Sequence, residues 1–313
     1  MIRLMKYLKP YIGFIAMTIM LLFVQAMCDL ALPDYMSNIV NKGIQQGGIE
    51  NAVPEALSKR KMDKLTAFMS PQDKDRVLDT YILVDDSSTY YNKYVKKYPA
   101  LEKEPVYVRK EISKEEIDEL NPVIGKSFIV LSYAEKIQQE AQQGQQFTAQ
   151  QGDAEKQLAM LDEKTIVQAA AALIKAEYKA LGMNTDKIQS KYIINTGIIM
   201  LLISLLGAVC TVAVGFFASR TAAGLARDLR RRMFTKIESF SNTEFDKFST
   251  ASLITRTTND ITQIQMVTVM IMRIVFFAPI LGIGGVIRAL GKSVSMSWII
   301  ALAVIVLLGL ILL

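Results

Sequence analysis

The residue types that carry out most enzyme and metal chemistry are scarce in this sequence. Its 313 residues include no histidine, and its two cysteines, Cys28 and Cys210, both fall inside apolar runs. A His/Cys metal site is therefore excluded. There is no G-x-S-x-G nucleophile motif, and the nearest lookalike of a phosphate loop, Gly285 to Ser293, has five residues between its glycines where that loop has four. We expect neither a catalytic residue nor a metal site in this chain.

The polar segment with the most distinctive spacing is SLITRTTNDITQIQ, residues 252–265. Its charged and amide side chains, Arg256, Asn259 and Asp260, are suited to a polar lock between two helices that move together. They are equally suited to solvating and capping one helix. Both interpretations place the segment on a helix outside the membrane.

The segment SNTEFDKFST, just upstream, has features of a short helix that docks onto a partner. Ser241 and Glu244 have the spacing of a capping box, and Phe245 and Phe248 form an apolar pair on one face. A hairpin connection needs no such pair, so exposed aromatic residues here favour a partner.

Polar side chains inside the apolar runs form a third group of candidates: Gln25, Asp29 and Arg273. A polar or ionisable residue at membrane depth is a candidate functional residue by default. Asp29 and Arg273 lie close enough to an interface to reach water, which favours a structural role for both.

Four apolar runs predict the elements that position these residues: 11–32, 192–219, 274–290 and 298–313. A span needs about 20 mostly apolar residues. The basic start of the first run has no convincing cleavage site of a signal peptide. Because the last run reaches residue 313 without a polar end, we expect the chain to be part of a longer protein.

Charge separates the segments between these runs. Residues 33–191 have a net charge of −2 and the remainder of +8. Basic residues precede the first run and follow the second, so the positive-inside rule predicts a cytoplasmic N-terminus, a cytoplasmic segment 220–256 and an extracellular 33–191. Arg288 and Lys292 depart from this pattern. No exposed basic stripe with interleaved aromatics is present, so we expect no nucleic-acid partner.

The extracellular segment 49–191 is predicted to be a soluble, helix-rich α/β insert. Ser70 and Pro71 begin one helix, and the capping box of Ser113 and Glu116 begins another. Residues 105–112 and 126–134 are candidate strands, the Gln-rich 138–152 a loop or weak helix, and 163–181 a helix that Gly182 ends. A group of tyrosines favours core packing over ligand binding: Tyr90, Tyr91, Tyr94 and Tyr98.

The second run is predicted to continue as one helix to residue 241, about 75 Å long against about 30 Å of hydrocarbon. The protruding part has an apolar stripe: Ala222, Leu225, Leu229, Met233 and Ile237. A narrower stripe follows on the returning helix: Ile254, Ile261 and Ile264. The outgoing stalk 219–241 and the returning stalk 251–273 have equal lengths, so they can pack antiparallel throughout.

These residues resemble a known family. SFSNTEFDKFSTASLITRTTNDITQIQ is similar to the first intracellular loop of ABC exporters of the half-transporter type, and ARDLRRRMFTKIESF and LPDYMSNIVNKGIQQG resemble bacterial multidrug-type members. The similarity covers residues 1–48 and 192–313. The insert 49–191 has no counterpart in the common pattern, and Thr250, Ala251 and Ser252 stand where the family has a Thr-Gly-Asp-like sequence.

The resemblance implies a six-helix transmembrane domain that works as a dimer with ATP-binding domains. Residues 243–250 correspond to the first coupling helix, which would seat on a nucleotide-binding domain: Thr243, Glu244, Phe245, Asp246, Lys247 and Phe248. The chain itself has no Walker A or ABC signature motif, so ATP and Mg are expected in the full-length protein only. The expected partners are the lipid bilayer, the nucleotide-binding domain of the same polypeptide and a second half-transporter, with a heterodimer favoured over a homodimer.

The sequence thus predicts a mainly α, polytopic protein of the bacterial cytoplasmic membrane with long helices extending into the cytoplasm. We expect an elbow helix and first span in 1–48, an insert in 49–191, and spans two to four with stalk and coupling helix in 192–313. The predicted function is ATP-driven export of an amphipathic or apolar substrate such as a drug, lipid or peptide. The alternative is a receptor whose outer domain binds a ligand and signals through the stalk, although a sensor needs no return into the membrane.

Overall fold

The computed structural model describes residues 7–142, 163–241 and 248–292, together with residues 298, 299, 302, 303 and 306. The chain divides into two compact units. Unit 1 contains Met1–Tyr35 and Ile199–Leu313, and unit 2 contains Met36–Ile198. The sequence-based boundaries at 49 and 191 remain a prediction.

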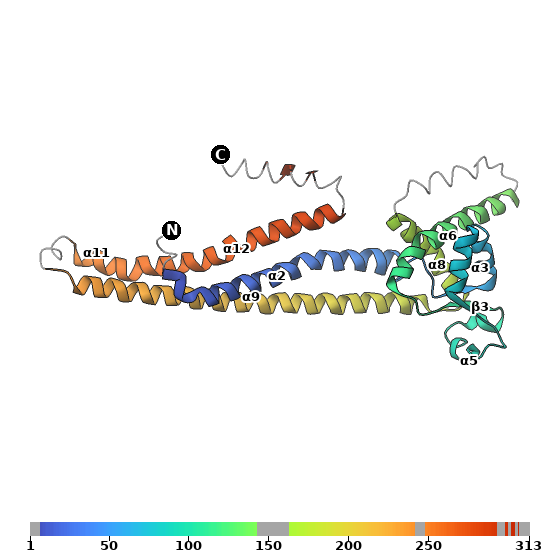
Figure 1. The fold of residues 1–313 in the computed structure, drawn as a ribbon, viewed down its shortest axis with the longest axis horizontal. Helices are drawn as coiled ribbons and strands as arrows, with labels where there is room; N and C mark the ends of the chain where they lie inside the picture. Colours follow the sequence, from blue (N-terminus) through green and yellow to red (C-terminus); the bar gives the residue numbers. More distant parts are fainter. Residues whose placement is uncertain are drawn as a thin grey trace. The chain divides into compact units, whose positions relative to one another are not determined.

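Unit 1 is built from long helices (Figure 1). A short 3₁₀ turn, η1 (Lys9–Tyr11), leads into α2 (Ile12–Asn38), and α9 (Thr185–Glu238) is a single helix of 54 residues. The chain returns through α11 (Thr250–Thr255), the π-helical turn η4 (Arg256–Asp260) and α12 (Ile261–Lys292).

Three helical stretches are long and apolar enough to cross a membrane: Lys9–Gln45, Thr185–Glu238 and Thr250–Gly291. They correspond to the first three predicted runs and confirm a mainly α, polytopic membrane protein. Most of the fourth run, 298–313, lies outside the described residues.

The first long helix continues beyond Asn38 as a π-helical segment, η2 (Ile39–Gln45), so Gly43 lies within the helix and does not end it. The chain turns at Gly47 and Gly48, which both have positive φ. A Cβ on Gly48 would lie 2.9 Å from the Cα of Gln189. Gly48 is therefore required both by its backbone conformation and by the close approach of α9.

Unit 2 combines a small antiparallel sheet with helices (Figure 1). The sheet has the order β1 (Ala56–Ser58), β3 (Val106–Arg109), β2 (Tyr81–Val84). Leu57 pairs with Tyr107 on one side of β3, and Leu83 pairs with Tyr107 on the other. The helical elements are α3 (Lys59–Thr66), α4 (Pro71–Asp79), α5 (Tyr91–Tyr94), η3 (Pro99–Glu102), α6 (Lys114–Gln142) and α8 (Glu163–Ala180).

Local signals placed several of these elements correctly. Ser70 accepts a hydrogen bond from the Asp73 amide at the start of α4. At the start of α6, the Ser113 amide donates to the Glu116 carboxylate at 2.8 Å and the Glu116 amide donates to Ser113 Oγ at 3.2 Å. The capping box is therefore confirmed. Gly182, with φ +77°, ends the helix α8 as expected.

The prediction of a strand at 126–134 was wrong, because these residues lie inside α6. Ile124, Phe128 and Leu131 are all buried, which is the spacing of one helix face and not of a strand. The strand β2 was missed because its four residues directly follow a predicted helix. The Gln-rich segment 138–152 lies outside the described residues beyond Gln142.

The core of unit 2 lies between the sheet and the helices α6 and α8. Among the predicted tyrosines, Tyr98 is 1% exposed and stacks on Tyr94 at 5.9 Å, whereas Tyr90 is 49% exposed. Tyr98 thus packs in the core as expected.

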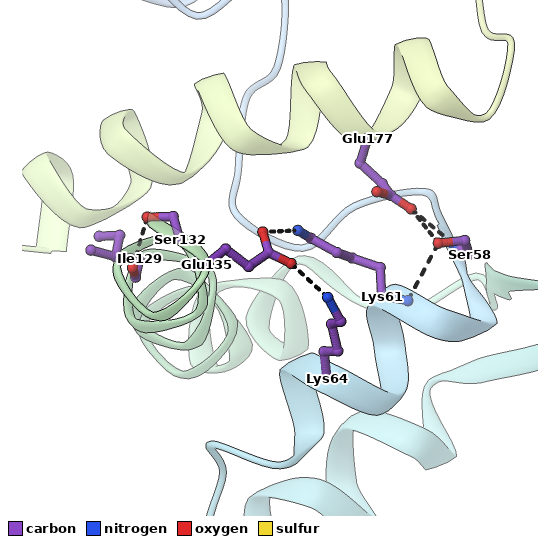
Figure 2. Close-up of polar contacts among 7 residues, drawn as sticks. All are labelled: Ser58, Lys61, Lys64, Ile129, Ser132, Glu135 and Glu177. Carbon is purple, nitrogen blue, oxygen red and sulfur yellow. Dashed lines mark hydrogen bonds and ion pairs between the residues drawn. The ribbon is translucent and has the colours of Figure 1, made fainter. Parts of the chain in front are cut away.

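Polar contacts join α3 to α6 and β1 to α8 (Figure 2). The buried Glu177 accepts hydrogen bonds from Ser58 Oγ at 2.7 Å and from the Ser58 amide at 3.0 Å. Glu135 bridges Lys61 and Lys64, each at 3.0 Å. Burial alone would raise the pKa of Glu135, but the hydrogen bonds from the two lysines outweigh burial and hold its pKa below the ordinary value.

Candidate functional site

The two stalks of unit 1 run side by side as an antiparallel hairpin (Figure 1). The Arg230 guanidinium donates to Thr262 Oγ1 at 3.2 Å. The outgoing stalk begins at residue 219 and the returning stalk ends at residue 273. Arg230 is as many residues from the first point as Thr262 is from the second, so this hydrogen bond has the register that equal stalk lengths predict. On α9 the predicted apolar stripe is buried at Ala222 and Leu225 and half-buried farther along.

Two stacked phenylalanine rings join the ends of the two stalks at the hairpin tip. Phe240, just after α9, stacks on Phe248, just before α11, with 5.8 Å between centroids. The Arg256 guanidinium lies 5.9 Å from the Phe248 centroid, and Lys236 Nζ lies 5.9 Å from the Phe240 centroid. Two cations thus flank two stacked rings, an arrangement that stabilises the ends of both stalks against each other.

Most of the predicted coupling helix lies outside the described residues. This applies to Thr243, Glu244, Phe245, Asp246 and Lys247, and to the capping box that includes Glu244. Phe248 is described and is 38% exposed, so its ring contacts the hairpin and still presents a surface to solvent.

Arg256, Asn259 and Asp260 lie together on the π-helical turn η4, and all three side chains are exposed. A single π-helical turn inside an α-helix often occurs at a functional site. Asn259 lines a groove of about 350 Å³ with Arg230, Thr258 and Thr262. The polar lock remains a prediction, since the hydrogen bond described between the stalks joins Arg230 to Thr262.

Threonine hydroxyls satisfy backbone carbonyls around this turn. Thr257 donates to the Leu253 carbonyl at 2.8 Å, and Thr258 donates to the Ile254 carbonyl at 2.8 Å. A π-helical turn interrupts the regular i→i−4 series and leaves carbonyls without their usual donors, and these hydroxyls supply replacements.

The π-helical turn also corrects the predicted stripe of the returning stalk. Ile254 is 57% exposed, whereas its neighbour Leu253 is 8% exposed and Ile261 is 3% exposed. Regular helical spacing aligns Ile254 with Ile261. The extra residue accommodated by the wider turn replaces Ile254 with Leu253 on the buried face.

The three predicted polar residues of the spans occupy different environments. Gln25 is 9% exposed, and its Oε1 has no hydrogen-bond partner among the described residues. Asp29 and Arg273 are exposed on the surface of unit 1. The structure therefore does not bring these three side chains together as one site.

An ion pair between α2 and α12 was missed by the sequence analysis. The Arg288 guanidinium pairs with the Asp34 carboxylate and donates to the Leu30 carbonyl at 2.5 Å. A Cβ on Gly284 would lie 2.5 Å from the Leu30 side chain, so this glycine permits close packing of the two helices. The signal was the basic Arg288 near the end of the third predicted run, where it departs from the positive-inside pattern.

No group of three or more cysteines and carboxylates that could hold a metal ion occurs within the described ranges. The arrangement consists of membrane spans, a protruding antiparallel hairpin and an exposed polar turn.

Comparison with known proteins shows what part of this chain is similar to. Residues 169–313 match the model of the ABC transporter transmembrane region. An uncharacterized ABC transporter ATP-binding protein of Mycobacterium tuberculosis is 36% identical over 112 residues, which cover 36% of this chain and 19% of that protein. A corresponding protein of Bacillus subtilis is 32% identical over 108 residues, 34% of this chain and 19% of that protein.

A putative ABC transporter ATP-binding protein of Mycoplasma pneumoniae is 32% identical over 98 residues, 31% of this chain and 16% of that protein. The chain thus aligns with less than a fifth of the length of these relatives. Residues 169–313 are therefore similar to an ABC transporter transmembrane region, and the apolar helices are those of a membrane protein.

Proposed function

We propose that the chain is the membrane subunit of an ATP-driven exporter of amphipathic or apolar substrates. The observation that carries this proposal is the stalk hairpin, which leaves the membrane along α9 and returns along α11 and α12. The relatives are named ATP-binding proteins, which supports a nucleotide-binding domain as the partner of the hairpin tip.

In this proposal the hairpin tip receives the movement of the nucleotide-binding domain. The stacked pair of Phe240 and Phe248 joins the tip to both stalks. A displacement at the tip would therefore move α9 and α12 together, and with them two of the spans. ATP and Mg would bind to the nucleotide-binding domain. The substrate would be moved outward by two such subunits, for which we favour a heterodimer.

ATP-driven transport by the full-length protein tests this proposal. Inside-out vesicles would be incubated with an amphipathic fluorescent dye, and its uptake would be followed with and without ATP. We expect Phe248→Ala to reduce uptake at least about tenfold while basal ATP hydrolysis persists, because coupling is lost and not nucleotide binding. Phe234→Ala is the matched control, since this equally aromatic residue is 64% exposed on the outgoing stalk of the same hairpin. ATP-independent uptake, or equal losses in both variants, would refute the proposal.

We further propose that unit 2 lies outside the cell and the stalk hairpin inside. A cysteine introduced at the exposed Tyr90 would react with an impermeant maleimide in intact cells. A cysteine at the exposed Phe234 would react only after permeabilisation. The reverse pattern would overturn the orientation without bearing on the transport role.

A further inference from the structure

A triad of polar groups fixes the start of the first span against α9. Tyr11 Oη donates to Asp228 Oδ2 at 2.8 Å, and the Arg227 guanidinium donates to Asp228 Oδ1 at 3.1 Å. The Tyr11 ring also occupies the space beside Gly224, where an added Cβ would lie 2.4 Å from it. The entry of α2 and residues 224–228 of α9 therefore lie at one level.

In this inference the edge of the hydrocarbon lies at this level, beyond the apolar run that ends at residue 219, because residues 221–226 carry no charge. Tyr11 begins the first apolar run, and tyrosines concentrate at membrane–water interfaces. Arg231 and Arg232 lie three and four residues beyond Asp228, or about 5–6 Å along the helix. The headgroup layer of each leaflet is about 5–7 Å thick, since the bilayer measures about 40–45 Å and its hydrocarbon about 30 Å. Both arginines are therefore at headgroup depth.

A groove of about 550 Å³ begins at this depth and extends along one face of α9 away from the span. We call it the basic groove; its lining residues are Asp228, Arg231, Arg232, Thr235, Lys236 and Ser239. It offers three cations, and its two hydroxyls already donate to carbonyls of α9. Its single carboxylate accepts hydrogen bonds from Tyr11 and Arg227. The Arg232 guanidinium lies 4.8 Å from the Tyr7 centroid, which orients it beside the groove.

The cations of the basic groove are not neutralised within the described part of the chain. No carboxylate there lies within ion-pair distance of Arg231, Arg232 or Lys236, whereas Arg227 is paired with Asp228. Exposed like charges within two helical turns repel one another. An anion that binds between them relieves this repulsion and also gains charge-assisted hydrogen bonds.

We propose that the basic groove binds the phosphate headgroup of an anionic phospholipid. The two guanidinium groups match phosphate geometry, and Lys236 adds a third positive charge on the same face of α9. Basic clusters immediately beside a span are attracted to anionic lipids. The adjacent hydrocarbon edge accommodates the acyl chains, which favours a lipid over a soluble phosphate compound.

Phospholipid retention in nanodiscs tests this proposal. The full-length protein would be placed in phosphatidylcholine nanodiscs with increasing phosphatidylglycerol, and bound lipid would be counted by native mass spectrometry. Each basic residue near an anionic surface contributes about a fivefold factor in affinity. We therefore expect roughly fivefold weaker phosphatidylglycerol binding for Arg231→Gln or Arg232→Gln, and roughly 25-fold weaker binding for the double variant.

Arg230→Gln is the matched control, because it removes the same charge one residue away while Arg230 faces Thr262 and not the basic groove. We expect this variant to weaken phosphatidylglycerol binding less than either groove variant does, because Arg230 already donates to Thr262 and does not line the groove. An equal loss of phosphatidylglycerol binding in the control would show a diffuse charge effect and overturn the proposal. Retention of phosphatidylcholine equal to that of phosphatidylglycerol would also overturn it. Displacement of phosphatidylglycerol by millimolar inorganic phosphate would assign the groove to soluble phosphate and overturn the lipid assignment. Helix content by circular dichroism verifies that each variant is folded.

Discussion

The π-helical turn η4 makes a specific prediction about single-residue deletions. Each residue of an α-helix adds about 100° of rotation. In a regular helix Leu253 would lie about 80° away from Ile261, yet both are buried. The turn η4 therefore contains one residue more than a regular α-helix would need to place both side chains on the same face. Deleting Thr257 converts the turn to regular α-helix and leaves Leu253 on the buried face.

Deletion of Gln265 is the matched control. Like the Thr257 deletion, it shortens the returning helix by one residue, but it removes that residue from the regular α-helical part of α12. The stalk beyond the deletion then rotates by about 100° relative to the span. Leu253 leaves the interface between the stalks, and burial of a leucine side chain worth about 1.5–3 kcal/mol is lost.

Cysteine labelling measures this difference directly. Leu253→Cys would be introduced into the wild-type and both deletion backgrounds and treated with a hydrophilic maleimide, with Ile254→Cys as the exposed reference. Cys28 and Cys210 are buried and give a low background. We expect Cys at 253 to react about 10- to 150-fold more slowly than at 254 in the wild type and in the Thr257 deletion. Comparable fast labelling at 253 in both deletions would refute the surplus-residue argument.

Three further predictions concern polar contacts. Replacing Glu177 by Leu removes the acceptor of the buried Ser58 amide and of the Ser58 hydroxyl proton. We expect about 2–4 kcal/mol of lost stability, seen as faster hydrogen exchange in unit 2, while Glu177→Gln loses less. The pKa of Glu135 is lowered in the folded state. Its contribution to the stability of the fold is therefore present above the unfolded-state pKa and is lost as the pH falls through the folded-state pKa. In urea denaturation, the free energy of unfolding of the wild type should exceed that of Glu135→Gln by less than about 1 kcal/mol at pH 7, and the two values should converge below about pH 4. A difference that stays constant with pH would contradict this. Arg288→Gln should increase hydrogen exchange near Asp34, and unchanged exchange would show that the ion pair adds nothing.

Local and periodic signals carried most of the fold prediction. The capping box at Ser113 and Glu116 needs only neighbouring residues, and the stalk of α9 needs only a sustained apolar stripe and no proline. Residues 126–134 were misread because β-branched and aromatic residues in a short window resemble a strand. Their burial at helical spacing becomes clear only over the whole of α6.

Contacts between distant parts of the chain were not predictable from one sequence. The ion pair of Asp34 with Arg288 depends on which spans pack together. The hydrogen bond of Tyr11 with Asp228 depends on the level at which α2 meets α9. The exchange of Ile254 for Leu253 arises because a wider turn changes the helical repeat itself, and periodicity analysis assumes a constant repeat.

The turn η4 also has a consequence for sequence alignment within the family. A relative whose returning stalk is a regular α-helix should align with this chain through a one-residue gap between residues 254 and 261. On either side of that gap, the same positions would still be apolar. Insertions and deletions of one residue are therefore tolerated at this place in the stalk, where elsewhere in the helix they would rotate every later side chain.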